Sequence, residues 1–175
     1  MHIKFYTLFT LLFFYSCSEY SPASERPKNV ILLISDGTGL SQISSAYFYK
    51  ESEVNYSRFQ HIGLITTSSS IEDITDSAAS ATAFSCGQKT YNGAIGVLED
   101  SKQLENIVEI ASLKGVKTGL VATSSITHAT PACFYAHVSD RDYVDEIALQ
   151  LTKSEIDYFA GGGEKNADSL CFAMQ

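Results

Sequence analysis

The sequence has no tryptophan and only three prolines and four cysteines among its 175 residues. The cysteines form no Cys-x-x-Cys pair, which excludes the common zinc-ribbon pattern, and they are too few for a disulfide-stapled fold of this length. Cys86 and Cys133 are therefore expected to be small buried apolar residues. The hydrophobic fraction of 45% and the charged fraction of 18% are those of a folded globular chain.

Basic residues are also scarce. Twelve Lys and Arg stand against 20 Asp and Glu, for a net charge of −8, and no long basic run is present. This balance disfavours a nucleic-acid partner. It also gives no long-range attraction for an anionic substrate, so any anion site has to be made locally, by metals, an arginine or helix N-termini.

The first residues have the pattern of an export signal. Lys4 precedes an apolar run at 5–15 that is too short for a comfortable transmembrane helix. Ser16-Cys17 follows, as at a bacterial lipoprotein processing site, where a lipidated Cys17 would attach the protein to a membrane. The alternative is a plain signal peptide, and both predict export to the periplasm or cell envelope. Residues 18–28, rich in Ser, Glu and Pro, are expected to be a tether.

From residue 29 onward, strand-like and helix-like segments alternate. Nearly continuous apolar or β-rich runs predict strands at 29–35, 62–67, 116–123 and 156–160. Apolar periodicity and small residues predict helices at 40–49, 76–85, 104–111 and 144–151. This alternation predicts an α/β fold with a mainly parallel sheet sandwiched by helices. Ligands bind such sheets beyond the carboxyl ends of the strands, so we expect Asp36 and residues 127–130 at one edge.

Two candidate residues lie near the first predicted helices. Asp36 follows the first predicted strand and is either a turn residue or a carboxylate ligand for a cation. The hydroxyl of Ser77, beside Asp76, lies at a helix N-terminus, where unpaired N–H groups favour an oxyanion or a phosphate. The plainer alternative for Ser77 is a simple N-cap residue. No Gly-x-Ser-x-Gly motif supports a Ser-His-Asp hydrolase.

Three further candidates follow the third predicted strand. In an extended segment His128 and Thr130 would face the same side and offer a nitrogen and an oxygen to a metal. Arg141 offers a planar fork for two phosphate oxygens. Each also has a plainer reading: His128 as a polar core residue, Thr130 as a turn residue and Arg141 as a surface ion-pair partner.

Together these segments resemble the alkaline phosphatase family in order and spacing. Residues 29–39 (NVILLISDGTG) are similar to the family's first strand and metal-binding Asp, and residues 75–83 (TDSAASATA) to its nucleophile signature. Residues 128–141 are similar to its magnesium and phosphate segment. The match continues through Gly87, Lys89, Thr90, Asn92, Gly93 and the glycines at 161–163, and it covers about residues 28–164.

The resemblance implies hydrolysis of small phosphate monoesters through a phosphoserine intermediate, with two zinc ions and one magnesium ion as cofactors. Ser77 would be the nucleophile, ionised by a zinc ion. Asp36 would bridge that zinc and the magnesium, so both side chains would be metal ligands. A homodimer follows by analogy with the family.

The resemblance also implies roles for the other polar residues. Asp76 would steer Arg141, whose guanidinium would hold two phosphate oxygens. His128 and Thr130 would lie at the magnesium, a place where some members carry Asp in the position of His128.

The resemblance ends after residue 164. The family's later ligands (a Glu, an Asp-x-x-x-His, an Asp-His pair and a final His) have no counterpart, so most zinc ligands are expected to be absent. We therefore predict a truncated member, incomplete at the C-terminus, with a leader at 1–17, a tether at 18–28, the phosphatase part at 29–164 and a divergent tail at 165–175. The alternative is a non-catalytic exported remnant or envelope lipoprotein. A sulfatase-like relative ranks lower because Ala81 stands where an Arg is required.

Overall fold

The computed structural model describes residues 27–163, and the chain divides into two units, 1–34 and 35–175. The predicted leader, most of the tether, Cys17, Cys171 and the tail lie outside the described residues. Within residues 27–163 no helix is long and apolar enough to cross a bilayer.

Two of the four predicted strands are wrong. In the first unit, residues 29–34 pair with no strand of the described chain, and Val30 and Ile31 are each 84% exposed. In the second unit, residues 62–67 form no strand either, and Ile62 is 90% exposed. An apolar run predicts burial, but a strand also needs a neighbour to satisfy its backbone N–H and C=O groups. Neither run has one among the described residues.

The second unit begins with helix α2 (Leu40–Tyr49), at the predicted bounds, and the 3-10 helix η2 (Asn55–Arg58). The backbone N–H of Gly39, which precedes α2, donates to Gln42 Oε1 at 3.0 Å. No residue of α2 or η2 is buried. These two elements therefore contribute nothing to the core of the described chain.

The rest of the second unit, as far as it is described, contains the helices α3 (Ser77–Cys86), α4 (Ile107–Leu113), α5 (Ala129–Ala132) and α6 (Val144–Leu151). Helix α3 ends at Gly87, whose φ of 70° is the left-handed conformation that glycine favours. Helix α4 begins with a reciprocal cap, in which Asn106 accepts from the N–H of Glu109 and Glu109 accepts from the N–H of Asn106. The predicted helix at 104–111 is thus confirmed, with its start three residues further on.

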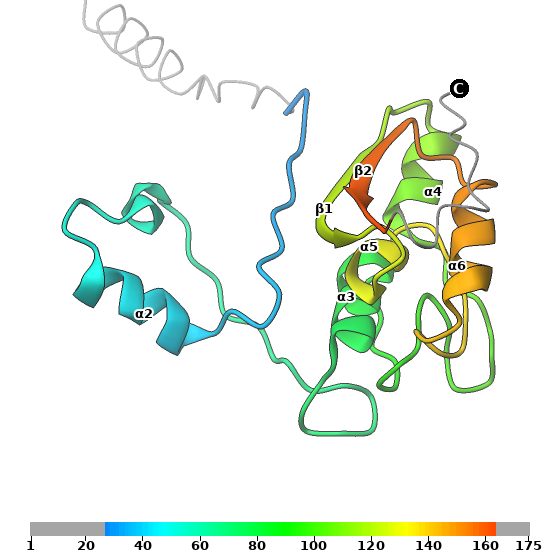
Figure 1. The fold of residues 1–175 in the computed structure, drawn as a ribbon, viewed down its shortest axis with the longest axis horizontal. Helices are drawn as coiled ribbons and strands as arrows, with labels where there is room; N and C mark the ends of the chain where they lie inside the picture. Colours follow the sequence, from blue (N-terminus) through cyan, green and yellow to red (C-terminus); the bar gives the residue numbers. More distant parts are fainter. Residues whose placement is uncertain (1–26, 164–175) are drawn as a thin grey trace, which may run out of the picture. The chain divides into compact units, whose positions relative to one another are not determined.

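The strands β1 (Gly119–Ser125) and β2 (Tyr158–Gly162) pair in parallel, with Leu120 opposite Phe159. Helices and a parallel sheet make the chain an α/β protein, as predicted, and Figure 1 shows β1 and β2 beside α4 and α5. Leu120 and Phe159 pack toward the core, whereas Val121 on the alternate face is 73% exposed. The described helices therefore cover one face of this sheet.

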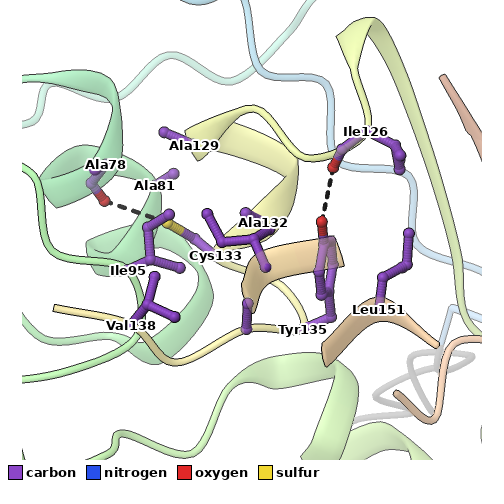
Figure 2. Close-up of a cluster of buried hydrophobic side chains, with 12 residues drawn as sticks. Ala78, Ala81, Ile95, Ile126, Ala129, Ala132, Cys133, Tyr135, Val138 and Leu151 are labelled. Atoms are coloured by element: carbon purple, nitrogen blue, oxygen red, sulfur yellow. Dashed lines mark hydrogen bonds between the residues drawn. The ribbon is translucent and has the colours of Figure 1, made fainter. Parts of the chain in front are cut away.

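The core lies between α3, α5 and α6 and is built largely from small side chains. Ala78 and Ala81 of α3 meet Ala129 and Ala132 of α5, which lets the two helices approach closely (Figure 2). Cys133 is fully buried among them, as predicted, while Cys86 is half-buried. The buried Tyr135 hydroxyl donates to the carbonyl of Ile126 at 2.8 Å and links the turn after β1 to the turn after α5.

Candidate functional site

The site begins at the N-terminus of α3. Asp76, and not Ser77, is the N-cap residue: its Oδ1 accepts from the N–H of Ala79 at 2.9 Å. Ser77 occupies the first helical position, so its hydroxyl is not used to cap the helix. The plainer reading of Ser77 as an N-cap is therefore wrong, and the hydroxyl is free to act elsewhere.

Ser77 and Thr130 meet at one carboxylate. Ser77 Oγ donates to Asp36 Oδ1 at 3.2 Å, and Thr130 Oγ1 donates to Asp36 Oδ2 at 3.0 Å. Asp36 is exposed, and Ser77 and Thr130 are half-buried, so the cluster opens to solvent. Residues 41 and 94 positions away from Asp36 in sequence thus converge on it, although the strand predicted before Asp36 is absent from the described residues.

Arg141 reaches the same helix start. Its Nη1 donates to Asp76 Oδ2 at 3.0 Å and its Nη2 lies 3.3 Å from His128 Nε2. A guanidinium can only donate, so His128 Nε2 is the acceptor in this contact. The side chains of Arg141 and Asp76 are 28% and 25% exposed, which shields the ion pair in part. Arg141 is therefore held near Ser77, the candidate nucleophile, by its bond to the adjacent residue Asp76.

The local structure around His128 differs from the prediction. His128 and Thr130 do not alternate in an extended segment, because His128 is the N-cap residue of the short helix α5 and Thr130 lies inside it. The residue Pro131 fits the first turn of a helix, where its missing N–H is not needed. As a result Thr130 faces Asp36, while His128 contacts Arg141.

A buried thiol lies directly behind the site. Cys133 Sγ is 3.3 Å from both the carbonyl of Ala78 and the hydroxyl of Thr82 on α3. Burial raises the pKa of the Cys133 thiol to about 12, so it stays protonated and serves packing. This thiol is no candidate nucleophile.

Sequence reasoning assigned no individual role to the turn at Asn92–Gly93. Asn92 Oδ1 accepts from the N–H of Asp76 at 3.0 Å, and the N–H of Gly93 donates to Asp76 Oδ2 at 3.1 Å. An Asn-Gly pair is a turn signal, which could have drawn attention to these residues. Nothing in the local pattern says that the turn packs against Asp76.

The donor set suits a hard cation. One carboxylate and two hydroxyls, from Asp36, Ser77 and Thr130, offer the oxygen ligands that Mg²⁺ prefers, with His128 nearby on the same segment as Thr130. Within residues 27–163 no group of three or more His, Cys, Asp or Glu side chains could hold a metal ion. The described residues thus fit part of a magnesium site and not a complete zinc site.

This α/β fold brings together a helix N-terminus, an arginine and a serine hydroxyl that does not cap the helix. Such an arrangement is typical of proteins that bind or cleave phosphate esters. Similarity to known proteins identifies the family. The sequence pattern of the alkaline phosphatase family matches residues 27–167, and the chain belongs to that family.

Individual relatives agree. The chain is 43% identical to alkaline phosphatase 3 of Bacillus subtilis over 157 residues, which covers 81% of this chain and 34% of the relative. It is 41% identical to an alkaline phosphatase of Schizosaccharomyces pombe over 160 residues, covering 85% of this chain and 30% of the relative. The chain thus spans about a third of the length of these relatives.

Solved structures show the same relationship. The alkaline phosphatase from the Antarctic bacterium TAB5 is 63% identical with a TM-score of 0.79, over 83% of this chain and 43% of that chain. A variant of the TAB5 enzyme in which a histidine is replaced by Asp carries Mg in its M3 site and gives the same TM-score at 61% identity, over 83% of this chain and 42% of that chain.

Proposed function

We propose that this chain carries the phosphate-binding and nucleophile part of a metal-dependent hydrolase of phosphate monoesters, which works through a phosphoserine at Ser77. The observation that carries the proposal is the start of α3. There the hydroxyl of Ser77, which does not cap the helix, donates a hydrogen bond to Asp36. The neighbouring carboxylate of Asp76 binds Arg141.

The chain's own residues supply much of the required chemistry. Ser77 Oγ would attack phosphorus in line while the bond from phosphorus to the ester oxygen breaks, and the alcohol would leave with a proton from solvent. The proton of Ser77 has an acceptor in Asp36 Oδ1 at 3.2 Å. Water would then hydrolyse the phosphoserine to phosphate and restore the Ser77 hydroxyl. The fork of Arg141 is oriented by Asp76 and would pair with two non-bridging oxygens of the phosphate. Phosphoryl transfer depends mainly on such positioning and charge neutralisation.

Asp36, Thr130 and Ser77 would hold divalent metal, with His128 beside them. When bound, the metal ions neutralise phosphate charge and stabilise the ionised serine. We propose two zinc ions and one magnesium ion, as the family resemblance implies, with most zinc ligands outside residues 27–163. The Mg in the M3 site of TAB5 variants, in which a histidine is replaced by Asp or Glu, supports a divalent metal in this family. His128 is proposed as the counterpart of that histidine.

The test is hydrolysis of an aryl phosphate by the purified chain with zinc and magnesium present. Three chains are compared: the unchanged one, Ser77→Ala and Ser80→Ala, which removes a neighbouring hydroxyl of the same helix. We expect turnover that Ser77→Ala abolishes and Ser80→Ala largely keeps. Equal turnover in all three chains would sink the proposal.

A second candidate is a non-catalytic exported remnant. It is favoured by the lack of a group of three or more His, Cys, Asp or Glu side chains that could hold a metal ion among residues 27–163. This candidate predicts folded protein that shows no turnover above Ser77→Ala with saturating metal.

The location and assembly are also proposals. Residues 1–17 would direct export to the periplasm or cell envelope, and lipid on Cys17 would anchor the protein to a membrane. Cys17→Ser would then move the protein from the membrane fraction to the soluble fraction. A homodimer is proposed by analogy with the family, and light scattering of the purified chain tests it.

A further inference from the structure

The turn at Asn92–Gly93 joins the two halves of the proposed site. On one side, Asn92 Oδ1 accepts the N–H of Asp76 at 3.0 Å, and its Nδ2 donates to the carbonyl of Ile74 at 2.9 Å. Nδ2 also donates to Glu72 Oε2. One side chain thus holds the backbone on both sides of Thr75, directly before Ser77.

The neighbours of Asn92 determine how its amide is oriented. The two groups at Nδ2 are acceptors, the carbonyl of Ile74 and the carboxylate of Glu72, and the group at Oδ1 is the N–H of Asp76, a donor. Only a side chain that both donates and accepts satisfies all three. Aspartate, which has the same shape, would satisfy one of them.

Gly93 connects the same carboxylate to the arginine segment. Its N–H donates to Asp76 Oδ2 at 3.1 Å, and its carbonyl accepts the N–H of Arg141 at 2.8 Å. Asp76 Oδ2 also accepts from Arg141 Nη1. The φ of Gly93, +92°, lies in the region that glycine favours. The turn therefore fixes both the backbone and the side chain of Arg141 relative to Asp76.

We propose that the Asn92–Gly93 turn is a positioning element that holds Ser77 and Arg141 in one fixed arrangement. Asn92 would act through the backbone at 74 and 76, and Gly93 through Asp76 and Arg141, without touching the phosphate. The inference rests on the proposed function, because it concerns the nucleophile and the phosphate-binding arginine of the same reaction.

Asn92→Asp is the informative change. It keeps the acceptor for the N–H of Asp76, removes the donor to Ile74 and places a second negative charge beside Glu72. We expect the amides of Asp76 and Ala79 to exchange hydrogen at least about 10-fold faster, because the helix start opens locally. For aryl phosphate hydrolysis we expect kcat/KM to fall at least about 10-fold through misplacement.

Two companions separate positioning from a general loss of stability. Glu72→Gln added to Asn92→Asp supplies a new donor opposite the new carboxylate, and should recover about half of the lost protection on a logarithmic scale. Asn106→Ala removes the cap of α4, away from the site, and lowers stability by a similar route without changing exchange at Asp76.

The two proposals fail in different ways. If exchange at Asp76 and Ala79 is the same in Asn92→Asp as in the unchanged chain, the positioning role is wrong, whatever the turnover. If Asn106→Ala speeds exchange at Asp76 equally, or the second substitution recovers nothing, it is also wrong. If Asn92→Asp exchanges faster at Asp76 and Ala79 but the unchanged chain hydrolyses no aryl phosphate, the positioning role is supported and the proposed function is wrong.

Discussion

The carboxylate of Asp76 connects three parts of the candidate site. Its two carboxylate oxygens accept from the N–H of Ala79, the N–H of Gly93 and Nη1 of Arg141. One residue therefore starts the helix, anchors the neighbouring turn and orients the arginine. A change at this residue should affect both stability and the arginine.

Asp76→Ala and Asp76→Asn separate these two effects. Asparagine caps a helix about as well as aspartate, whereas alanine leaves the first turn uncapped. We expect Asp76→Ala to lower the free energy of unfolding by about 1–3 kcal/mol and Asp76→Asn by less. Urea unfolding measures both. Equal losses would show that the cap contributes little.

Cys133 gives the chain a pH dependence in the alkaline range. Burial raises the pKa of its thiol from 9.0 to about 12. In the unfolded chain the thiol ionises from about pH 9, while in the folded chain it keeps its proton, so stability falls as pH rises between these values. Cys133→Ala should show a shallower fall between about pH 8 and about pH 11 in urea unfolding.

Cys86 provides a comparison for the burial of Cys133. It is half-buried, and burial also raises its pKa, though its thiol is nearer solvent. A thiol reagent should therefore modify Cys86 well before Cys133 in the folded chain. Faster modification of Cys133 would contradict the burial seen in the core.

At the scale of elements, the segment at Gly96 is pinned from two sides. Ile95 pairs with Val138 in a β-bridge, and both ring nitrogens of His137 face acceptors, the carbonyl of Gly96 and the carboxylate of Glu109, at 2.9 Å each. This places the His137 ring against the backbone of Gly96. No side chain larger than hydrogen fits there.

Gly96→Ala should be one of the costliest small substitutions in the chain. An added Cβ would lie 2.5 Å from the carbonyl oxygen of Ala136, at a φ of +61°. We expect the substitution to lower the free energy of unfolding by about 2–4 kcal/mol. Gly87→Ala has a similar φ of +70° but open space around it, and should cost about 1–2 kcal/mol. Thermal unfolding compares the two, and equal losses would refute the steric argument.

Local pattern predicted the helices better than the strands. Helices α2 and α6 have the predicted bounds because apolar periodicity and helix termination are properties of the segment itself. The strands at 29–35 and 62–67 failed because pairing depends on a partner elsewhere. Helix α5 was missed because it is a single turn around a proline.

The family resemblance pointed to Asp36, Ser77 and Arg141, whose roles stay predictions. Their contacts could be predicted only in part. That Asp76 caps the helix needed the structure, because it depends on where α3 begins. That His128 contacts Arg141 needed it too, because this contact depends on where α5 begins.

At the scale of the whole molecule, the described residues leave large apolar side chains exposed to solvent. Leu64 is 86% exposed and Leu33 is 83% exposed, in a chain that spans 43% of the TAB5 enzyme. Monomeric proteins rarely leave such runs in water without a partner.

Hydrogen exchange tests this surface directly. We expect amides at 30–33 and 62–65 to exchange about as fast as in an unfolded chain, while Leu120 of β1, paired with β2, is protected. Protection at 30–33 equal to that of β1 would mean that the segment is a paired strand.

The proposed function requires Ser77 to accept the phosphoryl group of the substrate. The chain is mixed with an aryl phosphate, zinc and magnesium, quenched in acid and digested, and the peptide that contains Ser77 is examined by mass spectrometry. We predict one phosphoryl group on Ser77, absent in Ser77→Ala and present in Ser80→Ala. Phosphate on another residue, or none on Ser77 while the aryl phosphate is consumed, would contradict the account.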